Sequence, residues 1–263
     1  MSGKMTKIAV FIDGNFFLKV NTYYRYHHER RSNISFRGLF DFIRNEVSIL
    51  EKTEANYCQI VESHWFRGRY STVNLEKRYP DEQQRMTQMT NERKIDDTFM
   101  HQGIVTHYFP VAYDYKTNEY EEKGIDVWLS LEAYEIATLK KFDVMVLIAG
   151  DSDYVPLIRK INGIGTRVMI LGWDFEYESY NESQARTFKH YTRTSQSLIE
   201  ECSYPIMMDK KIDDRTSKNS SVINSIFNFV QPYQTGGSGG GHYNKSANAN
   251  INANIGNTPS ETV

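Results

Sequence analysis

The sequence has few cysteines, no long apolar run and no strong excess of charge. Cys58 and Cys202 are its only cysteines, and their separation matches no metal-binding spacing, which argues against zinc chemistry and against a disulfide framework. No apolar stretch approaches the roughly 20 residues of a membrane span. The N-terminus shows no cationic segment followed by an apolar one, so we expect no export signal. These absences predict a cytoplasmic protein that has no membrane partner.

The length and composition predict one large domain with extensions. The chain has 263 residues and is 40% hydrophobic, which is enough for a substantial core. From residue 231 onward it becomes rich in Gly, Ser and Asn and cannot bury enough apolar surface to offset its ordering entropy. We predict a domain over 5–205, a C-terminal extension over 206–230 that includes a short docking helix, and a disordered tail over 231–263.

Apolar strand patterns alternate with helical patterns along the domain. Strands are predicted at 7–12, 56–62, 104–111, 142–149 and 166–171. Helices are predicted at 36–50, 74–102 with a break near Pro80, 126–139, 156–162 and 181–202, and a hairpin or loop at 114–120. Such alternation is typical of an α/β fold whose mostly parallel sheet is covered on both sides.

Aspartates follow two of the predicted buried strands. Asp13 ends the first strand, and Asp151 and Asp153 follow the apolar run Val144–Ala149. Because the carboxyl ends of parallel strands meet at one edge of a sheet, these carboxylates are expected to converge there. Asp126 begins a predicted helix, where a carboxylate is favoured. A hard cation such as Mg²⁺ or Mn²⁺ would offset the repulsion between such acids.

Each acid also has a purely structural interpretation. A single Asp after a strand is more often a turn residue or a helix cap, and this applies most strongly to Asp153 and to Ser152. Glu132 lies six residues after Asp126, about 120° around the helix, so it is expected only to flank the site. The coincidence of Asp13 and Asp151 at two strand ends favours a metal site.

The same residues resemble a known family. The segments Val10–Gly14, Glu122–Leu129 and Ala149–Leu157, with Gly163–Val168 after them, are similar to the NYN domain proteins, in the LabA-like branch of the PIN-like nuclease superfamily. The matches run in order from about residue 7 to about residue 200 and so cover the domain but not the tail. The last of the three segments is the most specific.

The resemblance implies a PIN-like three-layer α/β/α sandwich and a metal-dependent ribonuclease site. It implies catalytic roles for Asp13, Asp126, Asp151 and Asp153, the first three as ligands of Mg²⁺ or Mn²⁺. Glu132 takes a place where the family usually has another acid, and we expect it around the ligands with Asn15 and Ser152. The family's first motif typically has Asn three residues after the Asp. Here Phe16 takes that place, and Asn15 lies one residue earlier.

Two basic and aromatic segments are candidates for contact with RNA, one between Gly14 and Gly38 and the other over 64–78. Cations would bind phosphates and rings would stack on unpaired bases. For Phe16 and Phe17 packing in the core is the favoured interpretation, and for 23–31 both interpretations stay open. The cations expected to contact RNA are Lys19, Arg25, Arg30, Arg31, Arg67 and Arg69. The net charge of −2 requires any such contact to be local.

Three functions remain open at this point. The leading hypothesis is a divalent-metal-dependent endoribonuclease acting on single-stranded or structured RNA. The alternative is a catalytically weak module that binds RNA or protein, with the C-terminal extension recruiting a protein partner. Either function leaves an oligomer open. A phosphatase of the haloacid dehalogenase kind ranks lower, because it needs a second acid two residues after the first, where this chain has Asn15.

Overall fold

Six parallel strands form the central sheet in a computed structural model of the chain, which describes residues 4–181, 186–214, 216 and 220–227. The strand order is β10-β7-β6-β1-β2-β3. The strands are β1 (Thr6–Asp13), β2 (Cys58–Arg69), β3 (Val105–Pro110), β6 (Val144–Ile148), β7 (Arg167–Gly172) and β10 (Tyr204–Met207). The predicted α/β class with a parallel central sheet is confirmed. The predicted disordered tail, 231–263, lies outside the described residues.

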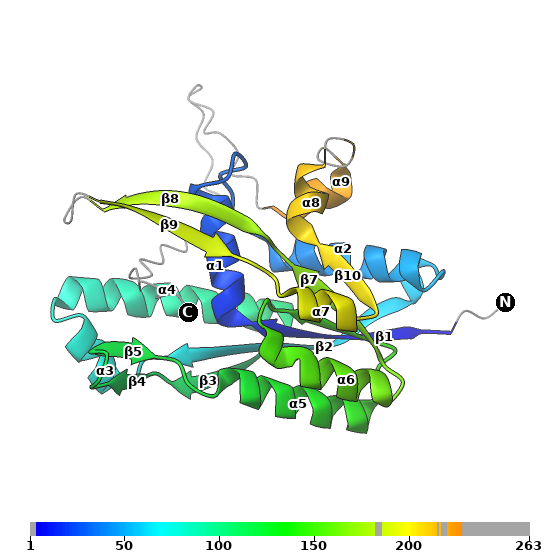
Figure 1. The fold of residues 1–263 in the computed structure, drawn as a ribbon, viewed down its shortest axis with the longest axis horizontal. Coiled ribbons are helices and arrows are strands. Elements are labelled where there is room, and N and C mark those ends of the chain that lie inside the picture. Colours follow the sequence, from blue (N-terminus) through cyan, green and yellow to red (C-terminus); the bar gives the residue numbers. More distant parts are fainter. Residues whose placement is uncertain (1–3, 182–185, 215, 217–219, 228–263) are drawn as a thin grey trace, which may run out of the picture.

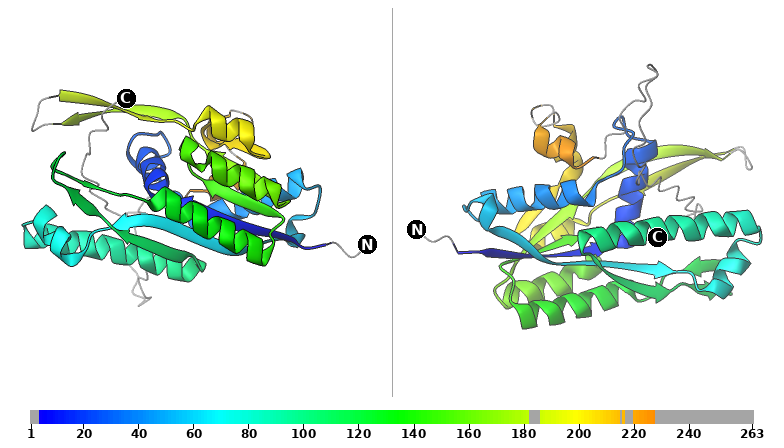
Figure 2. Two further views of the ribbon diagram at one scale, coloured as in Figure 1. Left: turned by 60° about the horizontal axis from the view of Figure 1, so that its bottom comes forward. Right: turned by 180° about the vertical axis from the view of Figure 1, so that it is seen from behind.

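Helices cover both faces of this sheet (Figures 1 and 2). One face carries α1 (Gly14–Tyr26), α2 (Phe36–Leu50) and α4 (Glu82–Gln102), and the other carries α5 (Ile125–Lys140), α6 (Val155–Gly163) and α7 (Gln196–Glu201). Strand β1 shows why helices must cover both faces of the sheet, because its apolar side chains point alternately to the two faces. Its residues Ile8, Val10 and Ile12 belong to one buried cluster, while Ala9 and Phe11 belong to the other.

The predicted break near Pro80 separates two helices. α3 (Thr72–Arg78) begins after Ser71, whose hydroxyl accepts a hydrogen bond from the Asn74 amide, and α4 begins after Asp81, which caps it in the same way. The short elements around them are the 3-10 helix at Ala55–Tyr57 and the hairpin of β4 (Ala112–Asp114) and β5 (Glu119–Glu121). Asn118 turns that hairpin with φ of 56°.

The predicted helix over 181–202 is wrong in its first part. An antiparallel hairpin of β8 (Phe175–Asn181) and β9 (Arg186–Thr192) takes its place, and only α7 is helical. Residues 175–178 alternate aromatic with acidic side chains, which is a strand period of two. The aromatic side of the hairpin packs on α1, where Phe175 stacks on Tyr23 at 4.1 Å and Tyr177 on His27 at 3.9 Å.

The sheet continues past the expected domain boundary at 205, because β10 spans Tyr204–Met207. After it come α8 (Met208–Asp213) and α9 (Ser221–Ser225). α9 docks on α2, and Ile223, Ile226 and Phe227 are buried in the larger core. These side chains are therefore occupied within the protein's own core. Across the described residues, no helix is both long and apolar enough to span a membrane.

Candidate active site at the carboxyl edge of the sheet

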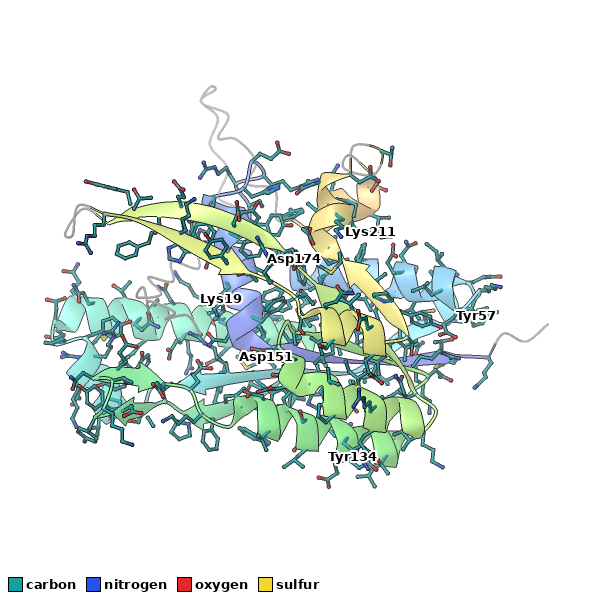
Figure 3. All side chains as sticks on the ribbon, viewed as in Figure 1. Lys19, Tyr57, Tyr134, Asp151, Asp174 and Lys211 are labelled. Atoms are coloured by element: carbon teal, nitrogen blue, oxygen red, sulfur yellow. The ribbon has the colours of Figure 1, made fainter. Side chains whose placement is uncertain are left out.

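Three aspartates from separate segments line one pocket of about 510 Å³. Asp13 is the last residue of β1, and Asp151 follows β6, the strand paired with β1. Asp126 lies in the first turn of α5. These three carboxylates therefore lie around one pocket at the carboxyl ends of β1 and β6. Figure 3 shows Asp151 after β6 and Lys19 on α1, and both side chains line this pocket.

Asp13 caps α1 from a partly buried position. Its Oδ1 accepts hydrogen bonds from the amides of Asn15, at 3.0 Å, and Phe16, at 3.1 Å, which caps α1. Burial, and to a lesser degree the charge of Glu122, raise the pKa of the Asp13 carboxyl from 3.8 to about 6. The fold therefore leaves negative charge in this pocket that no partner fully compensates.

Asp151, not Asp153, is the capping residue after β6. The Asp151 Oδ1 accepts a hydrogen bond of 3.0 Å from the amide of Asp153 and one of 3.4 Å from the Ser152 hydroxyl, and it begins the 3-10 helix Ser152–Tyr154. Asp151 and Ser152 line the pocket, whereas Asp153 does not. The capping role predicted for Asp153 is therefore taken by Asp151. Asp151 both caps the 3-10 helix and lines the pocket.

Tyr154 contributes to the pocket by holding Asp13 in place, and the sequence did not predict a role for it. Its side chain is fully buried, and its hydroxyl donates a 3.3 Å hydrogen bond to Oδ2 of Asp13. Burial, followed by the charges of Asp13, Asp126 and Asp151, raises the Tyr154 pKa far above its usual range. The phenol therefore stays protonated and serves as a donor to Asp13.

Glu122 is a fourth carboxylate in the pocket, and the family resemblance includes it in a motif but does not predict a role for it. Its side chain lies against Gly68 of β2, where an added Cβ would come within 2.5 Å of the Glu122 Cγ. Glycine at position 68 therefore leaves the room in which Glu122 lies. Its place four residues before Asp126, just ahead of the helix, was the available sequence signal.

Gly150 brings three segments into contact beside Asp151. A Cβ at this position would meet the ring of Phe16 at 2.6 Å and the carbonyl oxygen of Arg193 at 2.9 Å. The Gly150 carbonyl accepts a 2.8 Å hydrogen bond from the amide of Ser195. Phe16 is buried and contacts Trp173, while Asn15 is exposed, and both line the pocket.

A comparison with family models matches residues 7–209 to the NYN domain. The chain belongs to the NYN domain family. This family is part of the PIN-like nuclease superfamily. A solved structure of a protein of unknown function from Vibrio parahaemolyticus RIMD 2210633 is 20% identical, with a TM-score of 0.44, and the match covers 80% of this chain and 96% of that one. A comparison with curated proteins found no match.

Of the six cations predicted to contact RNA, Lys19 alone lines the pocket of the NYN domain. Arg30 donates to Asn224 and the Ile212 carbonyl, and Arg69 forms ion pairs with Asp96 and Glu92. The remaining three lie elsewhere: Arg25 is over the ring of Tyr26, Arg31 donates to the Tyr26 carbonyl, and Arg67 has a buried Nε that lacks a hydrogen-bond partner among the described residues.

Arg193 is a pocket cation that the sequence did not indicate. It follows β9, and its guanidinium donates to the carbonyls of Phe175 and Thr192 and to the Glu176 carboxylate. Arg193 was not predicted at the pocket because a helix was expected over this segment. The β8–β9 hairpin that forms instead brings Arg193 to the pocket. Lys19 and Arg193 together supply positive charge beside the acids of the NYN domain.

Glu132 lies on a different side of α5 from the pocket. It is not among the pocket-lining residues, and its charge acts instead on the pKa values of His64 and His107. Those imidazoles lie 3.0 Å apart, between Nδ1 of His64 and Nε2 of His107, and burial lowers both pKa values. The rotation of 120° from Asp126 along α5 accounts for this separation.

The chemical type of the ligand atoms in the NYN pocket, carboxylate oxygens, fits a hard divalent cation. The candidate ligands are the carboxylates of Asp13, Glu122, Asp126 and Asp151, and the raised pKa of Asp13 reflects charge that a cation would offset. In the described part of the chain, no group of three or more His, Cys, Asp or Glu side chains is close enough to hold a metal ion as it stands. The acids thus share a pocket without converging on one point.

Proposed function

We propose that this NYN domain protein is a divalent-metal-dependent endoribonuclease whose active site is the acidic pocket. The observation that carries the proposal is the gathering of Asp13, Asp126 and Asp151 in one pocket at the carboxyl edge of the sheet. Membership of the PIN-like nuclease superfamily supports hydrolysis of a phosphodiester. The motif Ala149–Leu157 supports a place in the LabA-like branch, and two free cysteines agree with a cytoplasmic location.

The residues divide into those that bind the cation and those that bind the substrate. We assign Mg²⁺ or Mn²⁺ to Asp13, Asp126 and Asp151, with Glu122 beside them. When bound, such an ion supplies Lewis acidity and makes a water molecule a better nucleophile at neutral pH. Lys19 and Arg193 are placed to contact phosphate oxygens of the RNA.

Tyr154 and the backbone amides orient the first aspartate. The amides of Asn15 and Phe16 hold one oxygen of Asp13, and the Tyr154 hydroxyl holds the other. This fixes the carboxylate before any ligand binds, which is the arrangement that positioned catalysis requires. We assign Tyr154 as a positioning residue, because it acts through Asp13.

The experiment is a cleavage assay on labelled single-stranded RNAs with Mn²⁺, Mg²⁺ or EDTA. We expect cleavage with either metal, none in EDTA, and a loss of at least about 100-fold in Asp151→Asn. Asp97→Asn, the same change on the exposed side of α4, is the matched control and should cleave normally. Intact RNA after incubation of wild-type protein with Mn²⁺ would rule the proposal out.

A second function is favoured by one specific pair of observations. The pocket acids do not converge, and Phe16 stands where the family typically has Asn. These features suit a catalytically weak module that binds RNA or protein. RNA binding that is unchanged in EDTA, together with absent cleavage in Mn²⁺, would select this function over the first.

A further inference from the structure

A second hollow, of about 520 Å³, lies between α3 and the β4–β5 hairpin. Its lining combines the rings of Tyr113, Tyr115 and Tyr120 with the cations Lys77 and Arg78, and two asparagines complete it. No carboxylate is among these lining residues. Figure 1 shows α3, β4 and β5 together at one end of the molecule, and the views of Figure 2 agree.

The two cations of this hollow are not neutralised by the described part of the protein. Lys77 and Arg78 are exposed and form no ion pair with a described residue, whereas Lys123 nearby pairs with both Asp114 and Glu121. Both cations lie in the last turn of α3, where they also favour the helix dipole. Their charge remains available to an anion, and the neighbouring rings indicate which kind of anion fits.

The three tyrosines form a ladder that ends in solvent. Tyr113 lies 5.0 Å from Tyr120 and 5.0 Å from Tyr115, measured between ring centroids. Tyr115, at the outer end, is 82% exposed, more than any other large hydrophobic side chain described. An aromatic face held out beside unpaired cations is the combination by which proteins bind single-stranded nucleic acid.

The hollow is formed in advance of any ligand. The Asn74 side-chain amide donates a 2.9 Å hydrogen bond to the Val111 carbonyl, which ties α3 to the start of the hairpin. Tyr120 packs edge-on against Tyr70, at 5.2 Å, and Lys123 bridges the two hairpin strands through its ion pairs. A ligand would therefore pay little ordering entropy on the protein side.

The hollow also lies next to the acidic pocket along the chain. Tyr120 lines the hollow and Glu122 lines the pocket, so their Cα atoms are at most about 7 Å apart. Because Gly68 has no side chain, Glu122 can lie directly against β2, where it separates the pocket from the hollow by only a short stretch of chain. A single strand that follows Glu122 and Tyr120 passes from the pocket to the hollow.

We propose that this hollow binds an unpaired nucleotide of single-stranded RNA, with the base stacked on Tyr115 and the phosphate between Lys77 and Arg78. The inference rests on the proposed function, because it assigns the hollow to the same RNA substrate. It adds that the substrate is single-stranded beside the cleaved bond, since a paired base cannot stack on a side chain.

The test measures binding without cleavage. A fluorescent oligouridylate of about twelve nucleotides is titrated with the full chain in EDTA, and anisotropy is recorded at several salt concentrations. We expect Tyr115→Ala to bind about tenfold more weakly and Tyr115→Phe to bind like wild type, because stacking needs the ring alone. The Lys77→Ala/Arg78→Ala variant should reduce the salt slope by about 0.7, because the contact with one phosphate is lost.

Two variants serve as matched controls. Tyr134→Ala removes an exposed tyrosine from α5 that does not line the hollow, and Figure 1 shows α5 apart from α3. Lys160→Ala removes a lysine from the last turn of α6, the equivalent of the position of Lys77 in α3. Both should bind RNA like wild type, and thermal melting should show that all variants fold.

The outcomes separate this inference from the proposed function. Hollow-dependent binding without cleavage in Mn²⁺ would support the hollow and reject the nuclease. Cleavage with unchanged binding in Tyr115→Ala and in the double variant would overturn the hollow and leave the nuclease standing. The hollow proposal would also be overturned if the protein bound an RNA duplex as tightly as the single-stranded oligouridylate. The same holds if it bound free uridine monophosphate as tightly as the oligouridylate.

Discussion

The acidic pocket and the tyrosine-lined hollow are neighbours along the chain but are built in opposite ways. The pocket joins residues from 13 to 195, on a frame that includes the fully buried Tyr154. The hollow uses residues 74–120, and its key side chains are exposed. Changes in the pocket should therefore alter both chemistry and stability, whereas changes in the hollow should alter binding alone. The following predictions test this contrast in order of decreasing effect.

The largest effect is expected from the pocket acids themselves. Asp126→Asn should reduce RNA cleavage by about 100-fold, because it removes one oxygen ligand from a charged site. Asp153→Asn, a change within the same sequence motif as Asp151, should stay within about threefold of wild type, since Asp153 does not line the pocket. Single-turnover rates with Mn²⁺ measure both. Equal losses would show that the sequence motif, and not the pocket, defines the site.

The second prediction concerns the stability of the pocket's frame. Gly150→Ala should lower the free energy of unfolding by about 1–3 kcal/mol, because the new methyl group meets Phe16 and the Arg193 backbone. Gly163→Ala, where an added Cβ meets nothing within 4 Å, should be neutral or stabilising by up to about 1 kcal/mol. Tyr115→Ala in the hollow should change little. Urea unfolding compares the three, and a stable Gly150→Ala protein would contradict the described packing.

The third prediction is a pH dependence centred on Asp13. Since folding raises the pKa of this carboxyl from 3.8 to about 6, the metal-free protein loses stability as pH rises through that window. Asp13→Asn keeps a capping side chain and should remove this loss, so its stability relative to wild type should be greater at pH 7.5 than at pH 4.5. Mn²⁺ affinity should fall about tenfold per pH unit below 6, because the cation competes with one proton. Calorimetric titration measures this, and a flat affinity would exclude Asp13 as a ligand.

The smallest effect is expected at the positioning residue. Tyr154→Phe removes the hydrogen bond that lowers the pKa of Asp13, so that pKa should rise and the acid limb of the pH–rate profile should move upward. Cleavage at high pH should fall only about three- to tenfold, as expected for one hydrogen bond of ordinary strength, because the Tyr154–Asp13 bond is long, at 3.3 Å. A lower rate with an unmoved profile would indicate a purely structural role for Tyr154.

Local sequence patterns determined the order of most elements and the edge at which the acids meet. The apolar runs before Asp13 and Asp151 are long enough to specify buried strands, and parallel strands bring their carboxyl ends together. The helix over 36–50 followed from its apolar periodicity, and the break near Pro80 followed from the proline itself. The NYN motifs lie in these same segments, so the family could be identified from the sequence.

Only the tertiary structure decided which side chains share the pocket with those acids. Glu122 enters it because Gly68 leaves room on β2, and Arg193 because the β8–β9 hairpin ends beside Gly150. Arg30 and Arg69 became internal partners once distant helices supplied their acceptors. These outcomes depend on contacts between residues far apart in the chain, which periodicity and spacing do not encode. The sequence by itself determined the acids at the sheet edge, and long-range packing determined their neighbours.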